Sequence, residues 1–393
     1  MTDRITRKVF LRRAAASGSI LTVPGLLAAC GGGGGGGGAS SGATTQQLAK
    51  TLRFSNWTLY MDRDLKNHTF PSLIEFQKKY GVHVDYMQDV NDNASFYGKI
   101  QGQLSKGQGI GRDIIVMTDN SPFPALLVKK GWVEKLDKSA IPNIKNLVPV
   151  QRHPAWDPNR DYSLPWQSGF TGIAYNERLT DPVLSIDDLF GNPKLKGKVT
   201  CLNEMGDALS LVMLANGDDP SHVTDATFNR AMAKIKKAVD SGQIRQFTGN
   251  DYAPPLAKGD LSAAMSWSGD IPQLDAPYIH WNLPTDGGDT WTDNMLIPTG
   301  GNVYTASVYM NYVYDPQVQG LMEAGDPKRN ITGIYYIPPV IGAKEAALKF
   351  NPPVAKNTDI FPTPKMLDNV HLFDPTALTN QKYLTAWQNL ISA

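Results

Sequence analysis

The stretch Leu52-Arg53-Phe54-Ser55-Asn56-Trp57 predicts a short strand that opens the folded part of the chain. Apolar residues with helical spacing follow over 72–80 and 93–104, and runs at 82–86 and 113–117 predict two further strands. This β-α-β-α-β order implies a mainly parallel sheet with helices on its faces. Ligands of such sheets bind beyond the carboxyl ends of the strands, so the search for a site begins there.

A second α/β unit of similar pattern follows along the chain. Its predicted strands lie at 172–176, 198–202 and 261–267, and its predicted helices begin at 185 and cover 208–215 and 226–239. The sequence has no repeat and no long linker between the two units. We therefore expect short, rigid segments to connect them.

Composition excludes several classes of protein. The 393 residues carry a net charge of +1, so no overall basic field points to nucleic acid. Two cysteines give no disulfide framework, and the six histidines lack metal-ligand spacing. The sequence 107–111 (Gly-Gln-Gly-Ile-Gly) precedes a predicted strand, which is the wrong context for a phosphate-binding loop. We expect neither a cofactor nor a metal.

The N-terminus predicts export. Residues 1–29 combine basic residues with an apolar, small-residue stretch that is too short and interrupted for an ordinary spanning helix, which is typical of a signal peptide. The sequence Leu27-Ala28-Ala29-Cys30 resembles a bacterial lipobox, which implies lipidation of Cys30. Residues 30–50, with eight consecutive glycines, predict a flexible tether. We expect a lipid-anchored protein facing the periplasm or the cell exterior. The segment 6–12 resembles a twin-arginine signal but has Lys8 at the second arginine, so the export route stays open.

Tryptophans stand beside carboxylates at positions that we expect in loops, mostly after strands. Examples are the sequences 57–60 (Trp-Thr-Leu-Tyr), 267–270 (Trp-Ser-Gly-Asp) and 291–293 (Trp-Thr-Asp). Glu204 and Asp207 are three residues apart at a predicted helix start, so both would lie on one face. Carboxylates neutralise ammonium groups, and aromatic faces attract cations and cover methylene chains. The pattern therefore predicts a site for a small organic polycation.

Six motifs in this order are similar to those of the spermidine/putrescine-binding proteins of bacterial ABC importers. They occupy 56–60, 131–139, 162–166, 265–269, 287–293 and 335–339. The Trp-x-Asp sequence after the Gly287-Gly288 turn is the most specific of them. The resemblance runs from about Leu52 to the last predicted helix.

The resemblance implies a two-lobed, type II periplasmic-binding-protein-like α/β fold with the ligand cleft between the lobes. Carried over to this chain, lobe 1 covers 51–167 plus 293–343, and lobe 2 covers 169–291 plus 345–393. The crossings between the lobes would fall near Ser168, Thr292 and Lys344.

The resemblance also implies ligand-binding residues. The family's positions fall on Trp57, Thr58, Tyr60, Thr118, Glu204, Asp207, Trp267, Trp291, Asp293 and Tyr336. In the family, the position of Asp207, with those of Trp291 and Asp293, holds a primary amine, and the position of Glu204 serves the inner amine.

The chain departs from the family pattern at the far end of the implied site. Leu59 replaces a glutamate, Asn120 an aromatic residue and Phe373 a glutamine. Asp119 and Asp270 are our candidates for supplying the missing charge. The length of the preferred polyamine stays open.

The leading hypothesis is a binding lipoprotein without catalytic activity that delivers a polyamine to an ABC permease. One alternative keeps the fold but binds another cationic metabolite, an amino acid derivative or an opine. A more distant alternative is a secreted hydrolase that uses Glu204 and Asp207 as an acid/base pair, since glycosidases place two carboxyls about 5–10 Å apart.

Overall fold

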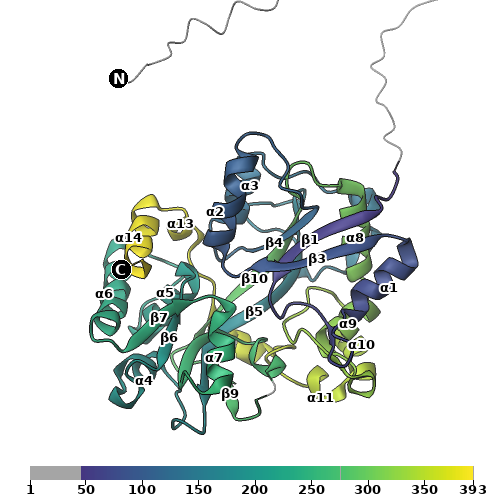
Figure 1. The fold of residues 1–393 in the computed structure, drawn as a ribbon. Helices are drawn as coiled ribbons and strands as arrows, with labels where there is room; N and C mark the ends of the chain where they lie inside the picture. The colour runs from purple at the N-terminus through teal and green to yellow at the C-terminus, as the bar shows by residue number, and fades with distance from the viewer. Residues whose placement is uncertain (1–45, 275, 393) are drawn as a thin grey trace, which may run out of the picture. The chain divides into compact units, whose positions relative to one another are not determined.

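The computed structural model describes residues 46–274 and 276–392 (Figure 1). The predicted signal peptide, Cys30 and the glycine run lie outside the described residues. The described chain forms one mixed sheet flanked by helices, with strand order β3-β1-β4-β10-β5-β8-β6-β7. Two short strands join its middle, because β12 (Val370–His371) pairs with β10 and β9 (Ile279–Asn282) pairs with β5.

The first half of the sheet consists of three parallel strands. They are β3 (His83–Val90), β1 (Thr51–Trp57) and β4 (Ile114–Thr118), with helices α1 (Pro71–Tyr80), α2 (Asn93–Leu104), α3 (Phe123–Lys129) and α8 (Val303–Val313). Helix α2 begins where Asp92 accepts a hydrogen bond from the Ser95 amide (2.7 Å), and α1 ends at Gly81, whose φ is 68°. Phe54 of β1 packs edge-on against Tyr309 of α8, which extends the core between sheet and helices. The strands and helices predicted here are confirmed.

The second half of the sheet has the parallel strands β8, β6 and β7. The elements are β6 (Val199–Leu202), β7 (Ile244–Thr248) and β8 (Ala263–Trp267), with α4 (Ile186–Gly191), α5 (Met205–Ala215), α6 (Asp225–Asp240) and α7 (Ala253–Lys258). Thr224 and Thr227 form a capping box that begins α6. The sequence patterns identified β6, β8 and the helices α4 to α6 but missed β7.

Two long antiparallel strands connect the halves. They are β5 (Ser163–Asn176) and β10 (Gly288–Leu296), which pair with each other and have Ser168 opposite Thr292. Strand β10 borders the first half, where Asp293 pairs with Thr118 of β4. Strand β5 borders the second half, where Thr171 pairs with Trp267 of β8. The predicted crossings near Ser168 and Thr292 therefore lie in regular strands. The loop expected at 291–293 is wrong, because these residues are in the middle of β10.

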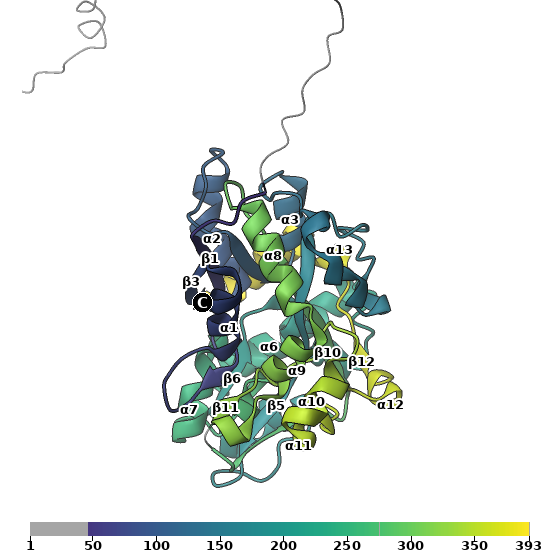
Figure 2. The same cartoon turned by 90° about the vertical axis from the view of Figure 1, so that its right-hand side faces the viewer.

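The last part of the chain stays with the first half longer than expected. Helix α9 (Pro316–Ala324) contacts α8 and α1, and α10 (Ala343–Phe350) packs on α9 where Gly320 meets Ala346. Helices α8, α9, α10 and α11 (Pro352–Ala355) follow one below another in Figure 2. Helix α10, which begins at Ala343, therefore packs on the first half past the expected crossing near Lys344.

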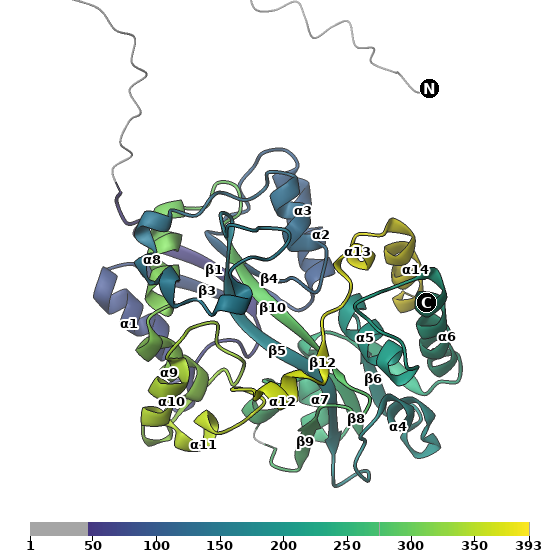
Figure 3. The same cartoon turned by 180° about the vertical axis from the view of Figure 1, so that it is seen from behind.

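The chain reaches the second half through its final segment. From α12 (Pro364–Leu367) it passes through β12, which pairs with Gly288 and Asp289, to α13 (Pro375–Leu378) and α14 (Gln381–Ile391) (Figure 3). The Tyr383 ring of α14 stacks on Phe228 of α6 at 4.1 Å between centroids. This C-terminal part packs on the second half.

The end of the predicted tether is bound to the folded body. The Ala49 amide donates to Thr305 Oγ1 (2.8 Å), and the Gln46 side chain donates to Asp137 Oδ2 (3.1 Å). Leu48 packs against the core. Residues 46–49, expected in the tether, are therefore attached to the folded body.

Among the described residues, no helix combines the length and the apolar character needed to cross a membrane.

Candidate functional site

A cavity lies where the two halves of the sheet meet. It has about 320 Å³ of space between protein atoms, some of it open to solvent. Its lining residues are Trp57, Thr58, Tyr60, Thr118, Glu204, Asp207, Asn250, Trp267, Asp270, Trp291, Asp293 and Tyr336. The structure thus brings together every predicted binding residue except Asp119.

The strand ends account for the position of these residues. Trp57, Thr118 and Trp267 are the last residues of β1, β4 and β8, and Glu204 and Asn250 follow β6 and β7. Trp291 and Asp293 are two apart in β10, so both point to the same face of the strand. The cavity therefore lies at the carboxyl ends of the parallel strands of both halves, as the α/β pattern predicted.

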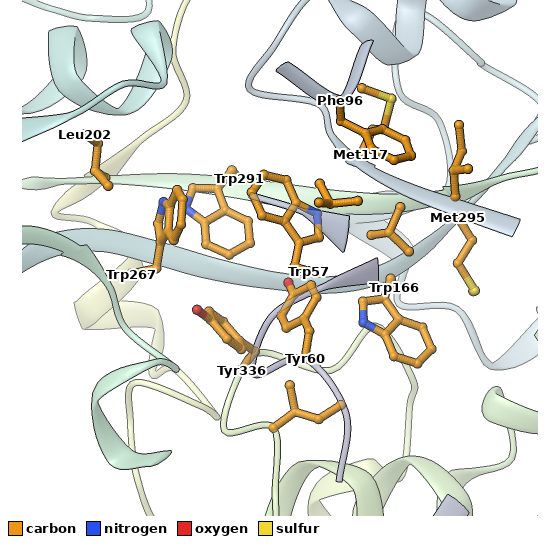
Figure 4. Close-up of a cluster of buried hydrophobic side chains, with 14 of the residues drawn as sticks. Trp57, Tyr60, Phe96, Met117, Trp166, Leu202, Trp267, Trp291, Met295 and Tyr336 are labelled. Atoms are coloured by element: carbon orange, nitrogen blue, oxygen red, sulfur yellow. The ribbon is translucent and has the colours of Figure 1, made fainter. Parts of the chain in front are cut away.

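Five aromatic side chains form the apolar part of the lining (Figure 4). The ring centroid of Trp267 lies 5.7 Å from that of Trp57 and 6.4 Å from that of Trp291. Tyr336 lies 5.6 Å from Trp291 and 4.9 Å from Tyr60. All five side chains are almost completely buried. Such rings can cover an aliphatic chain and present π faces to a cation.

Asp293 is held by two hydroxyl groups. Tyr60 donates to its Oδ2 at 2.6 Å, and Thr118 donates to its Oδ1 at 2.7 Å. Both donors come from the first half, so they orient the carboxylate of β10 without neutralising its charge.

Glu204 and Asp207 lie at the start of α5 and line the same cavity, as their spacing predicted. The backbone and side-chain nitrogens of Asn93 donate to Glu204 Oε1 at 2.6 and 2.9 Å. Asp207 accepts from Trp267 Nε1 (3.0 Å), Asn120 Nδ2 (3.2 Å) and the Thr171 hydroxyl. Residues of both halves thus hold these carboxylates in place.

Asp270 follows β8 and is bound by three neutral donors. Tyr336 donates to its Oδ1 at 2.7 Å, and Tyr252 and Asn250 donate to its Oδ2 at 2.7 and 2.8 Å. The carboxylate is 1 % exposed, so these donors replace water almost completely.

The charge of the cavity is unbalanced. The lining contains four carboxylates and no lysine, arginine or histidine. Burial raises the pKa of Glu204 to about 8, of Asp293 to about 7 and of Asp207 to about 6. Burial also raises the pKa of Asp270. Desolvation disfavours the charged form of each acid, and a cation in the cavity would reverse that penalty.

Asp119 lies outside the cavity lining. Its Oδ1 accepts from the Thr292 amide (2.9 Å), and its own amide donates to Thr292 O (2.9 Å). This reciprocal pair ties the end of β4 to the middle of β10. Asp119 therefore binds the backbone of β10 at the crossing and does not line the cavity.

The three departures from the family pattern also lie outside the lining. Leu59 has a φ of 59°, and Phe373 is buried in the core. Asn120 reaches the site indirectly, because its Nδ2 donates to Asp207 and to Asp289 Oδ2 (2.7 Å). The far end of the site that these residues were expected to form is not part of this cavity.

Sequence reasoning missed three polar residues that serve the carboxylates. Asn250 lines the cavity, Asn93 binds Glu204, and Tyr252 binds Asp270. Recognising β7 would have placed Asn250 and Tyr252 after a strand end. Asn93 is the first residue of α2, and nothing in the sequence of that helix indicates that Asn93 binds Glu204 in the other half.

No group of three or more His, Cys, Asp or Glu side chains within 46–274 and 276–392 is arranged to hold a metal ion. Hydroxyl, amide and indole donors hold the cavity carboxylates.

Comparison with known proteins places these observations in a family. Residues 73–326 match the family described as "Bacterial extracellular solute-binding protein". The spermidine/putrescine-binding periplasmic protein of Escherichia coli K12 is 26% identical over 348 residues, which cover 86% of this chain and 91% of that protein.

Two solved structures share the fold. The spermidine/putrescine ABC transporter substrate-binding protein PotD of Streptococcus pneumoniae has a TM-score of 0.66 at 20% identity, over 88% of this chain and 98% of that one. The PBP AgtB of A. tumefaciens R10, in complex with agropinic acid, has a TM-score of 0.67 at 18% identity, over 88% of this chain and 100% of that one. The predicted periplasmic-binding-protein-like fold is confirmed, and the chain belongs to the family of bacterial extracellular solute-binding proteins.

Proposed function

We propose that this protein is the substrate-binding component of an ABC importer and that it captures a polyamine of the putrescine or spermidine type. The observation that carries the proposal is the set of four buried carboxylates and five aromatic rings in one cavity without a basic residue in its lining. The similarity to the spermidine/putrescine-binding protein of Escherichia coli supports the same assignment.

The chemistry of a diamine fits this cavity. Each ammonium group loses water on entry, and an ionised carboxylate restores its hydrogen bonds and balances its charge. The methylene chain between the amines needs an apolar cover, which the indole and phenol rings provide. Asp293 and Asp207 are the proposed partners of one primary amine, with Trp291 beside it. Glu204 would serve the inner amine of a triamine.

Capture would involve closure of two lobes about the paired crossings in β5 and β10. We assign 51–167 and 293 to about 361 to one lobe, and 169–291 with the C-terminal segment to the other. Asn93 and Asn120 of the first lobe donate to Glu204 and Asp207 of the second, so these contacts would form on closure. No catalytic step is part of the proposal, and the permease would receive the bound ligand.

The proposal includes export and a lipid on Cys30. The basic start, the apolar stretch and the lipobox-like sequence support it. Cys30→Ser should release the protein from the membrane fraction or leave a precursor of higher mass. Unchanged fractionation together with unchanged mass would contradict the anchor.

Titration calorimetry with putrescine, spermidine, agropinic acid and 4-aminobutyrate tests the ligand class. We expect heat of binding with a polyamine and none with the two acids, because their carboxylates would face an acidic cavity. Binding of agropinic acid alone would favour the opine alternative, and binding of none of the four would reject the polyamine assignment.

A further inference from the structure

Gln273 joins three loops around the cavity without lining it. It ends a short turn (Ile271–Gln273) that follows Asp270. Its Nε2 lies 2.7 Å from Leu59 O, 3.0 Å from Gly269 O and 3.0 Å from Ile334 O. These three carbonyls belong to segments that are far apart in the sequence.

The chemistry of the partners fixes the orientation of this amide. All three are carbonyl oxygens, which only accept hydrogen bonds, so the NH₂ group and not the oxygen must face them. Its two hydrogens serve three acceptors, so at least one hydrogen is shared.

Each carbonyl is next to residues that line the cavity. Leu59 lies between Thr58 and Tyr60, Gly269 precedes Asp270, and Ile334 is two residues before Tyr336. The Gln273 amide therefore links the three loops by hydrogen bonds, although Gln273 does not itself line the cavity.

The loop contacts leave little room for movement. Leu59 has a φ of 59°, a left-handed conformation that costs a leucine about 1–2 kcal/mol and persists only where neighbours hold it. A Cβ at Gly269 would overlap the Tyr336 ring, so this ring lies directly against the loop before Asp270. The Tyr336 hydroxyl then meets Asp270 at 2.7 Å.

We propose that Gln273 is a positioning residue that sets Tyr60, Tyr336 and Asp270 for ligand binding. The choice of a polyamine as probe rests on the proposed function. The positioning role itself requires only that the three loops depend on the Gln273 amide.

The test replaces the donor and keeps the length of the side chain. Gln273→Met removes both N–H groups, and Gln273→Glu places oxygen against the three carbonyls. Loss of two hydrogen bonds of ordinary strength should weaken putrescine binding by roughly 10- to 100-fold in calorimetry. Gln103→Met, at an exposed position on α2, is the matched control and should bind like the parent protein.

A double-mutant cycle separates positioning from general stability. If Gln273 acts through the Tyr336 loop, the losses caused by Gln273→Met and Tyr336→Phe should not add, whereas the losses of Gln273→Met and Glu204→Gln should add. Additive losses in both pairs would overturn the proposal.

Crystal structures of the parent and Gln273→Met proteins in the same closed state, in which Tyr336 meets Asp270 in the parent, give a readout of the loops themselves. In the Gln273→Met protein we expect the Tyr336 hydroxyl to leave Asp270. An unchanged contact would overturn the positioning role whatever the ligand is, whereas failure of the parent protein to bind any polyamine would reject the proposed function alone.

Discussion

The two halves of the sheet give different chemistry to the same cavity. The first half supplies aromatic rings and hydroxyls but no carboxylate: Trp57, Thr58, Tyr60, Thr118 and Tyr336. The second half supplies Glu204, Asp207 and Asp270, and the crossing strand β10 adds Asp293. The second half therefore provides most of the charge together with the Trp267 ring, and the first half provides three of the five rings and the hydroxyls that orient Asp293.

This difference predicts different failures on the two sides. Loss of a carboxylate should weaken binding strongly, since the ligand would leave an ammonium unpaired. Loss of the Tyr60 or Thr118 hydroxyl should chiefly weaken the unliganded fold, since it leaves a buried oxygen of Asp293 without a donor.

The largest effect is expected for Asp293→Asn, which keeps the shape of the side chain and removes its charge. Truncating one partner of a buried charge pair costs about 2–5 kcal/mol, or roughly 30- to several-thousand-fold in affinity. Calorimetry with putrescine measures the loss. The exposed Asp85→Asn on β3 is the control, and an effect of equal size there would remove the special role of the cavity.

Gly206→Ala should be next in size and should act where the halves meet. A Cβ at Gly206 would overlap the Asn120 side chain of the first half. Overpacking of this kind costs about 1–3 kcal/mol, which corresponds to roughly 5- to 150-fold in putrescine affinity if the contact forms on closure. Gly102→Ala on α2, with nothing within 4 Å of its new methyl, should leave affinity unchanged. Equal affinities of all three proteins would count against closure at this contact.

Tyr60→Phe should lower the free energy of unfolding of the unliganded protein by about 1–3 kcal/mol, because Asp293 Oδ2 loses a donor at 2.6 Å. Denaturant unfolding measures this change. The half-buried Tyr304→Phe on α8 serves as the control. A large loss of putrescine affinity without loss of stability would contradict the division between the two halves.

The smallest effect, taken over one pH unit, is the change of stability and of ligand affinity with pH. Between the ordinary glutamate pKa of 4.5 and its raised pKa of about 8, folded Glu204 keeps a proton that the unfolded chain releases. The free energy of unfolding of the unliganded protein should therefore fall as pH rises through this window. The inner amine of spermidine, the proposed partner of Glu204, favours the ionised acid, so spermidine affinity should rise with pH, by up to about tenfold per pH unit for each proton released.

Glu204→Gln should make both the free energy of unfolding and the ligand affinity depend less on pH above neutral pH. Affinity that stays constant from pH 6 to 8 would show that no cavity acid changes its proton on binding.

The sequence pattern predicted most of the parallel strands well, but it did not predict that residues 163–171 and 288–296 are strands. The helix expected at 93–104 has these bounds in the structure, because its apolar periodicity and the Asp92 cap agree. Strands β5 and β10 carry Gln167, Ser168 and Asp293 in their middle, and such polar residues break the pattern of a buried strand. Asp293 lines the cavity, and the Ser168 hydroxyl forms a hydrogen bond with the Thr292 hydroxyl across the strand pair (2.8 Å).

The cavity lining was predicted almost completely, whereas the residues behind it were not. Trp57, Trp267 and Glu204 stand out in the sequence because they are aromatic or acidic residues at the ends of predicted strands. The family resemblance supplied Thr118 and Tyr336. Asn93, Asn120 and Gln273 act through amide hydrogen bonds to distant segments, and only tertiary structure brings those partners together.

The central claim is that the cavity binds a dication by its two charges. Calorimetry with putrescine, butylamine and butane-1,4-diol tests it directly, because the three ligands share a four-carbon chain and carry two, one and no ammonium groups. We expect putrescine to bind at least about 30-fold more tightly than butylamine, on the same charge-pair magnitude, and the diol not to bind. Equal affinities of putrescine and butylamine, or binding of the diol alone, would contradict the account.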